Sequence, residues 1–319
     1  MENFQYILPE IFISVSIMIF LLVGVFKKNS ATLIYNLSNI SLVILLALII
    51  NLSSLDTIYL FNESYLIDNL SNYMKIILVG SGIFVMLTGS KYIQVINLNK
   101  IEYPILILSS ILGMMIMISS NDLIVFYMGL ELQSLALYVL ASFNRDNLLS
   151  TESGLKYFVL SALSSGLLLY GCSLTYGFSE STNFDQILIN STEFNYGTTF
   201  GIVFILVGLA FKISAVPFHM WAPDVYQGSP TSVTLFFAIL PKIAALSVFI
   251  KFLYTPFANM NDQWQTIIVF ISIASMIFGA VAAIGQKNLK RLIAYSSISH
   301  MGYALAGLAT VSNQGIQSS

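Results

Sequence analysis

The chain has 319 residues, of which 57% are apolar, 13% aromatic and only 9% charged, and its formal net charge is −2. An ordinary soluble domain carries about 25% charged residues, so this composition excludes a water-soluble protein and predicts an all-α polytopic membrane protein. The small net charge gives no indication of a nucleic-acid partner, and a single cysteine, Cys172, excludes a disulfide framework within the chain and any cysteine-clustered zinc or iron–sulfur site.

Ten apolar runs bounded by polar or turn residues follow one another along the chain. Because a helix needs about 20 apolar residues to cross the roughly 30 Å hydrocarbon core, a chain of this length has room for about ten spans. The runs begin near Tyr6, Thr32, Ser71, Pro104, Leu123, Gly154, Thr198, Pro230, Gln265 and Lys290. The first run has no basic segment before it and is too long for a signal peptide, so we expect a retained span. The acidic connection over residues 179–199 is predicted to be a loop.

The basic residues alternate between successive connections. Eight of the 13 Lys and Arg residues lie in alternate connections: Lys27, Lys28, Lys91, Lys100, Arg145, Lys287, Lys290 and Arg291. The connections between these hold acidic residues instead: Asp56, Glu63, Asp68, Asp122, Glu180, Asp185, Glu193 and Asp262. By the positive-inside rule, this alternation predicts the N-terminus on the outer side and the basic connections on the cytoplasmic or matrix side.

The other basic residues lie within the predicted spans, at different depths. Lys75 and Lys251 lie close to span ends, so we expect their side chains to reach water along the helix surface. Lys212 and Lys242 lie about 9 to 12 residues into their runs, which is roughly 14 to 18 Å at 1.5 Å per residue and near the membrane midplane. A midplane lysine costs about 2.5 to 3.5 kcal/mol, which favours a functional role over a static ion pair.

Polar side chains on the same spans supply candidate partners for these lysines. The fifth run carries a polar stripe at helical spacing: Tyr127, Glu131, Ser134 and Tyr138. Such a stripe must face protein or trapped water. Glu152 and Lys156 stand four residues apart in the favourable order, so a local salt bridge is nearly as well supported as a relay role for Lys156.

The seventh run contains Pro217, five residues after Lys212. Proline lacks a backbone donor and clashes with the preceding turn, so we predict a helix break just beyond Lys212. Broken helices are tolerated in membranes where they line a polar cavity. His219 directly follows the break, where a structural donor and a proton carrier are equally good interpretations. In the eighth run, Pro241 directly precedes Lys242 and predicts a second perturbed helix.

These buried groups predict proton or cation transfer rather than redox chemistry. Burial disfavours a charged lysine and a nearby carboxylate favours it, so a movement of Glu131 relative to Lys212 would change the protonation of the lysine. The sequence has no Gly-rich dinucleotide motif, no phosphate-binding loop and no paired histidines for haem or metal. We therefore expect no cofactor and no metal site in this chain.

Four stretches of the sequence carry a resemblance to a known family. They are residues 129–135 (GLELQSL), 154–157 (GLKY), 211–231 (FK to DVYQGSPT) and 289–298 (LKRLIAYSSI). They resemble subunit 2 of mitochondrial respiratory complex I and its bacterial counterpart, the N subunit of NADH:quinone oxidoreductase. The resemblance implies an antiporter-like helical bundle with a Pro-broken transmembrane helix. It implies three N-terminal helices over residues 1–95, a first five-helix repeat over residues 104–255 and the start of a second, inverted repeat over residues 264–319.

The resemblance also implies a function. The chain would be a proton-translocating membrane-arm subunit of NADH:ubiquinone oxidoreductase in the mitochondrial inner membrane, an enzyme subunit without a redox centre. In the implied site, Glu131 and Lys212 are the interacting acid and base, and Lys242 is the neighbouring relay residue. Three further residues would be auxiliary members of the site: Lys156, His219 and Tyr295. Other subunits would bind NADH, flavin, iron–sulfur clusters and quinone. Its partners would be other membrane-arm subunits and lipids.

Two alternatives and one departure accompany this interpretation. The same buried lysines fit a subunit of a multisubunit cation/proton antiporter or of the plastid NDH-like complex, and a purely structural scaffold is a third possibility. The family usually has a complete second repeat with another broken helix and buried lysine, whereas this chain ends at Ser319, just beyond the tenth run. We expect either a fragment or a split gene whose missing helices come from a separate polypeptide.

Overall fold

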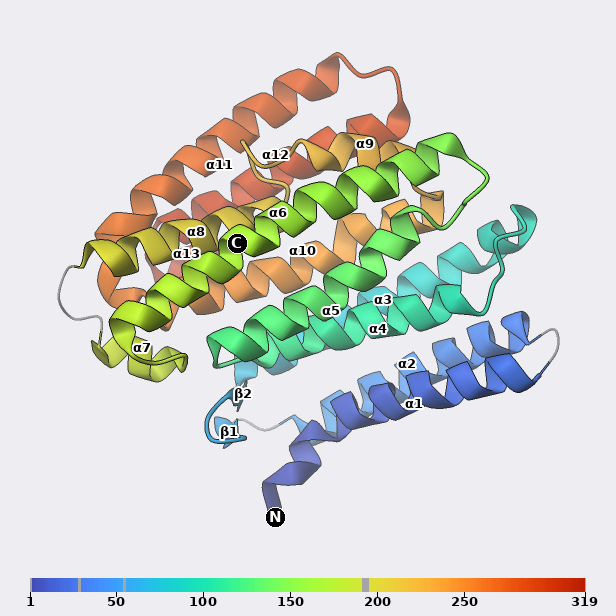
Figure 1. Cartoon of the computed structure of the whole chain (residues 1–319), viewed down its shortest axis with the longest axis horizontal. Coiled ribbons are helices and arrows are strands. Elements are labelled where there is room, and N and C mark those ends of the chain that lie inside the picture. The colour runs from blue at the N-terminus through green and yellow to red at the C-terminus, as the bar shows by residue number, and fades with distance from the viewer. Residues whose placement is uncertain (1, 28–29, 54–55, 191–194, 319) are drawn as a thin grey trace. The chain divides into compact units, whose positions relative to one another are not determined.

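The computed structural model of the chain describes residues 2–27, 30–53, 56–190 and 195–318 (Figure 1). Each of the ten predicted runs forms a helix: α1 (Leu8–Phe26), α2 (Ala31–Leu52), α3 (Asn69–Val95), α4 (Glu102–Ser119), α5 (Leu123–Ala141), α6 (Leu148–Ser179), α8 (Tyr196–Lys212), α10 (Thr231–Tyr254), α11 (Asn261–Ile284) and α12 (Leu289–Ala309). Shorter elements lie between and beside them: η1 (Glu2–Ile7), β1 (Ile58–Leu60), β2 (Tyr65–Ile67), α7 (Phe184–Asn190), α9 (Trp221–Gly228), η2 (Ala258–Met260) and α13 (Asn313–Ser318). The predicted all-α polytopic fold is confirmed.

Among the described residues, eight helices are long and apolar enough to cross a membrane, namely α1 to α6, α10 and α11. Helix α8 is a shorter apolar helix of 17 residues, because it ends where the seventh run is interrupted. Helix α12 carries Lys290 and Arg291 in its first turn and is not in this group. Helix α6 has 32 residues and is much longer than its neighbours in the chain.

The chain divides into two compact units. The first contains Met1–Gly154 and Ser229–Ser247, and the second contains Leu155–Gly228 and Val248–Ser319. Helices α6 and α10 each contribute residues to both units. The predicted division into three N-terminal helices and two repeats stays a prediction.

In the first unit, α4 and α5 pack closely because glycines lie where the two helices meet. A Cβ atom at Gly113 would lie 2.5 Å from the backbone nitrogen of Gln133 and 2.8 Å from the carbonyl oxygen of Gly129. A Cβ atom at Gly129 would lie 2.9 Å from the backbone nitrogen of Met117. Small residues of this kind let the backbones of two membrane helices approach each other.

Strands β1 and β2 form an antiparallel hairpin between α2 and α3, with Tyr59 opposite Leu66. Residues 61–63, at the turn, have positive φ angles between 51° and 65°, which non-glycine residues rarely adopt. The backbone N–H of Asn121, in the α4–α5 connection, donates to the carbonyl oxygen of Ser64 at 2.9 Å. The hairpin is therefore fixed to the end of the α4–α5 pair.

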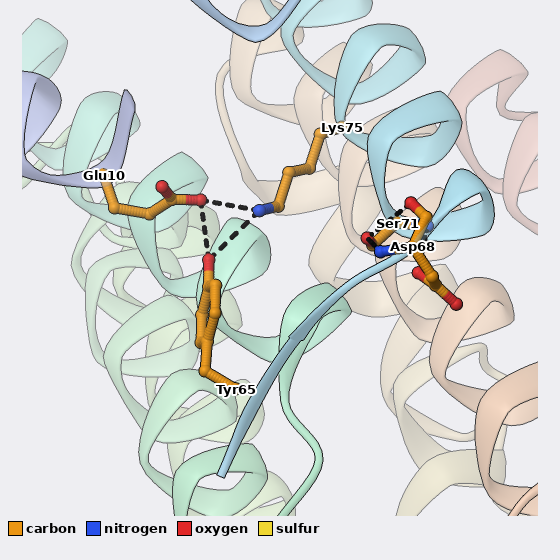
Figure 2. A network of polar contacts seen from close by, with 5 residues as sticks. All are labelled: Glu10, Tyr65, Asp68, Ser71 and Lys75. Atoms are coloured by element: carbon orange, nitrogen blue, oxygen red, sulfur yellow. Dashed lines mark hydrogen bonds and ion pairs between the residues drawn. The ribbon is translucent and has the colours of Figure 1, made fainter. Parts of the chain in front are cut away.

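Polar residues cap several helices at their N-terminal ends. Asp68 Oδ1 accepts the backbone N–H of Ser71 at 2.9 Å, and Ser71 Oγ accepts the backbone N–H of Asp68 at 2.9 Å (Figure 2). This reciprocal pair is a capping box at the start of α3. Asp122, Asn195 and Asn288 likewise accept first-turn N–H groups of α5, α8 and α12. These caps explain why the helices begin where the apolar runs begin.

In the second unit, α11 and α12 lie side by side (Figure 1). A Cβ atom at Gly279 would lie 2.7 Å from the backbone nitrogen of Ser299, and one at Gly302 would lie 2.9 Å from the backbone nitrogen of Met276. The Ser272 hydroxyl donates to the carbonyl oxygen of Gly302 at 2.7 Å. Close backbone approach and this hydrogen bond join the two helices.

The predicted loop over residues 179–199 is wrong in part, because it contains the short helix α7. Phe184 and Ile187 anchor α7, and both are fully buried. A segment of seven residues covers only about two helical turns, which is too short for a periodic signal to predict a helix. Lys28 and Glu193, which contribute to the predicted charge alternation, lie outside the described residues.

Candidate functional site

The seventh run is interrupted where the sequence predicts. Helix α8 ends at Lys212, and α9 begins only after the irregular residues 213–220. Pro217 lies in this segment and cannot donate the backbone hydrogen bond that a continuing helix needs. The freed N–H of Val216 donates to Ser275 Oγ on α11 at 2.9 Å, so this backbone donor is satisfied. The predicted break beyond Lys212 is confirmed.

Lys212 is buried at the end of the broken helix, with 5% of its surface exposed. Its Nζ donates to the hydroxyl oxygen of Ser161 on α6 at 2.8 Å, and Ser161 is fully buried. The last carbonyl groups of an α-helix have no partner within the helix and carry partial negative charge, which favours a cation in the last turn. A serine hydroxyl both accepts and donates, so it is suited to pass a proton onward.

Aromatic rings hold the two halves of the broken helix together. The indole N–H of Trp221, at the start of α9, donates to the carbonyl oxygen of Phe211 at 2.9 Å. The Trp221 ring stacks on Tyr157 of α6 with centroids 4.6 Å apart and on Phe211 with centroids 5.7 Å apart. These contacts fix the position of the break relative to Lys212.

The rings of His219 and Tyr295 both lie close to the ring of Phe278. His219 is half-buried in the irregular segment, and its ring centroid lies 4.5 Å from that of Phe278 on α11. The Phe278 ring lies 6.3 Å from that of Tyr295 on α12. Nδ1 of His219 is buried and has no hydrogen-bond partner among the described residues. The auxiliary roles predicted for His219 and Tyr295 stay predictions.

Asp224 on α9 joins three helices through two ion pairs. Lys156 Nζ of α6 lies 2.8 Å from Asp224 Oδ2, and Arg291 Nη1 of α12 lies 2.8 Å from Asp224 Oδ1. Burial raises the pKa of Asp224, but the hydrogen bonds and charges of Lys156 and Arg291 outweigh it and hold this pKa below its ordinary value. The carboxylate therefore stays ionised at neutral pH.

Reasoning from the sequence did not give Asp224 a role. Spacing along one helix suggested Glu152 as the partner of Lys156, whereas Asp224 is 68 residues away. The available signal was an acidic residue directly after the Pro-broken segment, in a chain with few charges. Only the tertiary packing of α9 shows which basic residues it meets.

Glu131 lies on α5 within the predicted polar stripe. It is half-buried, and Ser134 and Tyr138 of the same stripe are buried. Oε1 of Glu131 is buried and has no hydrogen-bond partner among the described residues. An unsatisfied carboxylate oxygen in this position is costly unless water or a donor reaches it.

Lys242 is buried on α10, with 6% of its surface exposed. Helix α10 continues through Pro241, so the perturbation predicted beside Lys242 is not a break. Glu131 and Lys242 belong to the first unit and Lys212 to the second. The interaction of Glu131 with Lys212 stays a prediction.

The expectation that Lys75 and Lys251 reach water is wrong, because only 3% and 5% of their surfaces are exposed. Lys75 Nζ lies 2.7 Å from Oε1 of Glu10, which is buried on α1 (Figure 2). The position of a lysine in its span predicts the distance from its side chain to water along its own helix. It does not predict whether a neighbouring helix covers that side chain.

Comparison with known proteins shows the family. The family model described as "NADH:quinone oxidoreductase/Mrp antiporter, TM" matches residues 120–319. The chain is 71% identical over 321 residues to NADH-quinone oxidoreductase subunit N of Pelagibacter ubique (strain HTCC1062), a match that covers 100% of this chain and 68% of that protein.

Solved structures share the fold. A chain of respiratory complex I from Thermus thermophilus with bound aureothin matches with a TM-score of 0.81 and 29% identity, over 95% of this chain and 64% of that one. A chain of the Mrp complex from Dietzia matches with a TM-score of 0.84 and 19% identity, over 96% of this chain and 59% of that one. The second likeness concerns the fold alone. The chain spans about two thirds of the length of the subunit N relative and of the complex I chain.

Proposed function

Because the chain belongs to the family of NADH:quinone oxidoreductase and Mrp antiporter membrane subunits, we propose that it moves protons in the membrane arm of an NADH–quinone oxidoreductase. The observation that carries this proposal is Lys212, a lysine buried at a helix break and hydrogen-bonded to a buried serine. A charge held away from water at the end of a broken helix is expensive. We infer that Lys212 is retained in this position because it takes up and releases a proton.

In the proposed path, Lys212 is the central base and Ser161 the first group that receives its proton. Glu131 is the acid that controls the charge of Lys212, and Lys242 is the next relay residue. Lys156 is an auxiliary residue of the path, and the ionised carboxylate of Asp224 holds its ammonium in place beside Arg291.

Electron transfer is proposed to take place in other subunits. NADH, flavin, iron–sulfur clusters and quinone would be bound there, and this chain would carry no cofactor. Its partners would then be the neighbouring membrane-arm subunits, which convert the redox reaction into movement of the buried charges.

We also propose an orientation, with the N-terminus on the outer side of the membrane. The alternation of basic and acidic connections supports it. The subunit N relative described above is from a bacterium, which favours a bacterial energy-conserving membrane over the mitochondrial inner membrane that the resemblance suggests.

A cation/proton antiporter subunit is the second candidate. The same family model covers Mrp antiporters, and the Mrp complex from Dietzia shares the fold. Purification of the chain from its native membrane separates the two candidates. Copurification with flavin- and iron–sulfur-containing subunits supports the oxidoreductase, and their absence from an intact complex supports the antiporter.

The test of the proposed function replaces Lys212 in the assembled complex. Loss of a positioned proton-transfer group typically slows a reaction by about 10²–10⁴-fold, so Lys212→Ala should nearly abolish NADH-driven proton pumping. Lys212→Arg should also fail, because an arginine side chain does not release its proton. Lys251→Ala is the matched control, since Lys251 is equally buried and lies outside the proposed path. Normal pumping by both Lys212 variants, with assembly verified on a native gel, would contradict the proposal.

A further inference from the structure

A buried polar triad joins three elements of the first unit (Figure 2). Glu10 Oε1 of α1 accepts hydrogen bonds from Lys75 Nζ of α3 at 2.7 Å and from the Tyr65 hydroxyl of β2 at 2.7 Å. Lys75 Nζ also donates to the Tyr65 oxygen at 3.0 Å. The side chains of Glu10 and Lys75 are only 6% and 4% exposed. The proposed proton path does not use these three residues.

The second carboxylate oxygen of Glu10 has a different environment from the first. Oε2 is buried and has no hydrogen-bond partner among the described residues. A buried carboxylate oxygen without a donor is unfavourable, and most such atoms in proteins are satisfied by protein, water or a ligand. Glu10 is also one of the residues that line a pocket, so its side chain forms part of the pocket wall.

This pocket has a volume of about 370 Å³, which is within the range of small-molecule sites. It lies among α1, α4, α5 and the β1–β2 hairpin. Its walls are mainly apolar, with Ile11 of α1, Leu112 and Ile116 of α4 and Phe61 of the hairpin. An apolar pocket with one carboxylate fits an amphiphile whose polar end carries a hydrogen-bond donor.

The surface beside the pocket is suited to lipid. On α1, Ile11, Val15 and Met18 are 45%, 50% and 63% exposed, and on α5 Ile124 is 61% exposed. Apolar side chains on the outside of membrane-spanning helices face the hydrocarbon chains. The pocket also adjoins the polar hairpin and the α4–α5 connection, where spans end and lipid headgroups begin.

We propose that this pocket binds a phosphatidylethanolamine molecule. One acyl chain lies along Ile11, Leu112 and Ile116, and the primary ammonium donates to Oε2 of Glu10. A charge-assisted hydrogen bond to a carboxylate is stronger than a neutral one, so an ammonium fits this oxygen well. The trimethylammonium of phosphatidylcholine has no N–H donor and cannot make the bond. The proposal does not depend on the proposed proton path.

The first test compares two lipids that differ only in this headgroup. The delipidated full chain is titrated in detergent with phosphatidylethanolamine or phosphatidylcholine of identical acyl chains, and bound lipid is counted by native mass spectrometry. We expect phosphatidylethanolamine to bind about tenfold more tightly, the order expected for one charge-assisted hydrogen bond. Equal affinity for the two lipids would overturn the proposal.

Two variants locate the binding. Ser14 lines the pocket and its hydroxyl donates to the Ile11 carbonyl oxygen of its own helix, so Ser14→Phe fills the pocket without replacing a residue of the triad and should remove the preference. Ser90→Phe is the matched control, because Ser90 is also a half-buried helical serine bonded to its own helix but lies away from the pocket. A preference that persists in Ser14→Phe, or that Ser90→Phe removes equally, would contradict this location.

Glu10→Gln tests the acceptor atom itself. The donors Lys75 and Tyr65 hold the remaining oxygen, so the new amide NH₂ takes the place of Oε2 and presents a donor to the pocket. The variant should bind both lipids equally. Thermal unfolding shows whether the triad still folds, and a folded variant that keeps the native preference would exclude Glu10 as the recognition group.

Discussion

Each buried lysine whose contacts the structure describes has a specific polar partner from another element. Lys212 contacts Ser161 of α6, and Lys75 contacts Glu10 of α1 and Tyr65 of β2. The sequence predicts the depth of such lysines, because depth follows from position within an apolar run. The partners could not be predicted, because they come from residues 51 and 65 positions away.

One prediction concerns the side chain of Glu131. If its charge increases the proton affinity of Lys212, then Glu131→Gln should slow coupled turnover, and Glu131→Asp should retain partial activity because its charge is withdrawn by one methylene. The double variant Glu131→Gln with Lys212→Ala should be little worse than Lys212→Ala alone. Turnover and pumping of the assembled complex measure this. Additive losses would mean that the two residues act independently.

A second prediction concerns the ion pairs of Asp224 with Lys156 and Arg291. Because its folded pKa is lowered from 3.8, the ion pairs of Asp224 contribute stability that is fully present above that value and is lost as the pH falls through the folded pKa. The groups are partly exposed, so the contribution is at most about 1 kcal/mol. Thermal unfolding at neutral pH should show Asp224→Asn less stable than the native chain, with the difference vanishing in acid. Glu180→Gln, which changes an exposed acid directly after α6, should leave the profile unchanged.

At the scale of elements, what could be predicted follows from local chemistry. The apolar runs, the polar caps and the break at Pro217 each depend on a few neighbouring residues, and the structure confirms the runs and the break. The hairpin and α7 could not be predicted because they are short: β1 and β2 have three residues each, and α7 has seven. Such short segments depend on tertiary contacts, such as the bond from Asn121 to Ser64.

A prediction about helix packing concerns the contact between α4 and α5. Gly113→Leu would place a side chain against the backbone of α5, so the helices must separate, and overpacking of this kind costs about 1–3 kcal/mol or more. Gly80→Leu is the control, because a Cβ atom at Gly80 of α3 has nothing within 4 Å. Thermal unfolding in detergent measures both. Equal stability of the two variants would show that the close approach is not required.

At the scale of the whole molecule, the orientation is open to a direct measurement. Cys172 is the one cysteine in the sequence and is buried, so it gives little background to a membrane-impermeant maleimide. Glu180 and Lys287 are exposed and lie in connections that we assign to opposite sides. Glu180→Cys should be labelled from the outer side of sealed vesicles and Lys287→Cys from the inner side. The reverse pattern would invert the proposed topology.

The length of α6 has a consequence for how the membrane itself acts on the site. Its 32 residues extend about 48 Å, well beyond a hydrocarbon core of roughly 30 Å. A helix longer than the hydrocarbon core is accommodated by tilting or by projecting into the headgroup layer, and the tilt changes with bilayer thickness. Ser161, the hydrogen-bond partner of Lys212, lies on this helix. The thickness of the surrounding bilayer therefore becomes a physical variable that tunes the geometry of the buried lysine, independently of any change in the chain.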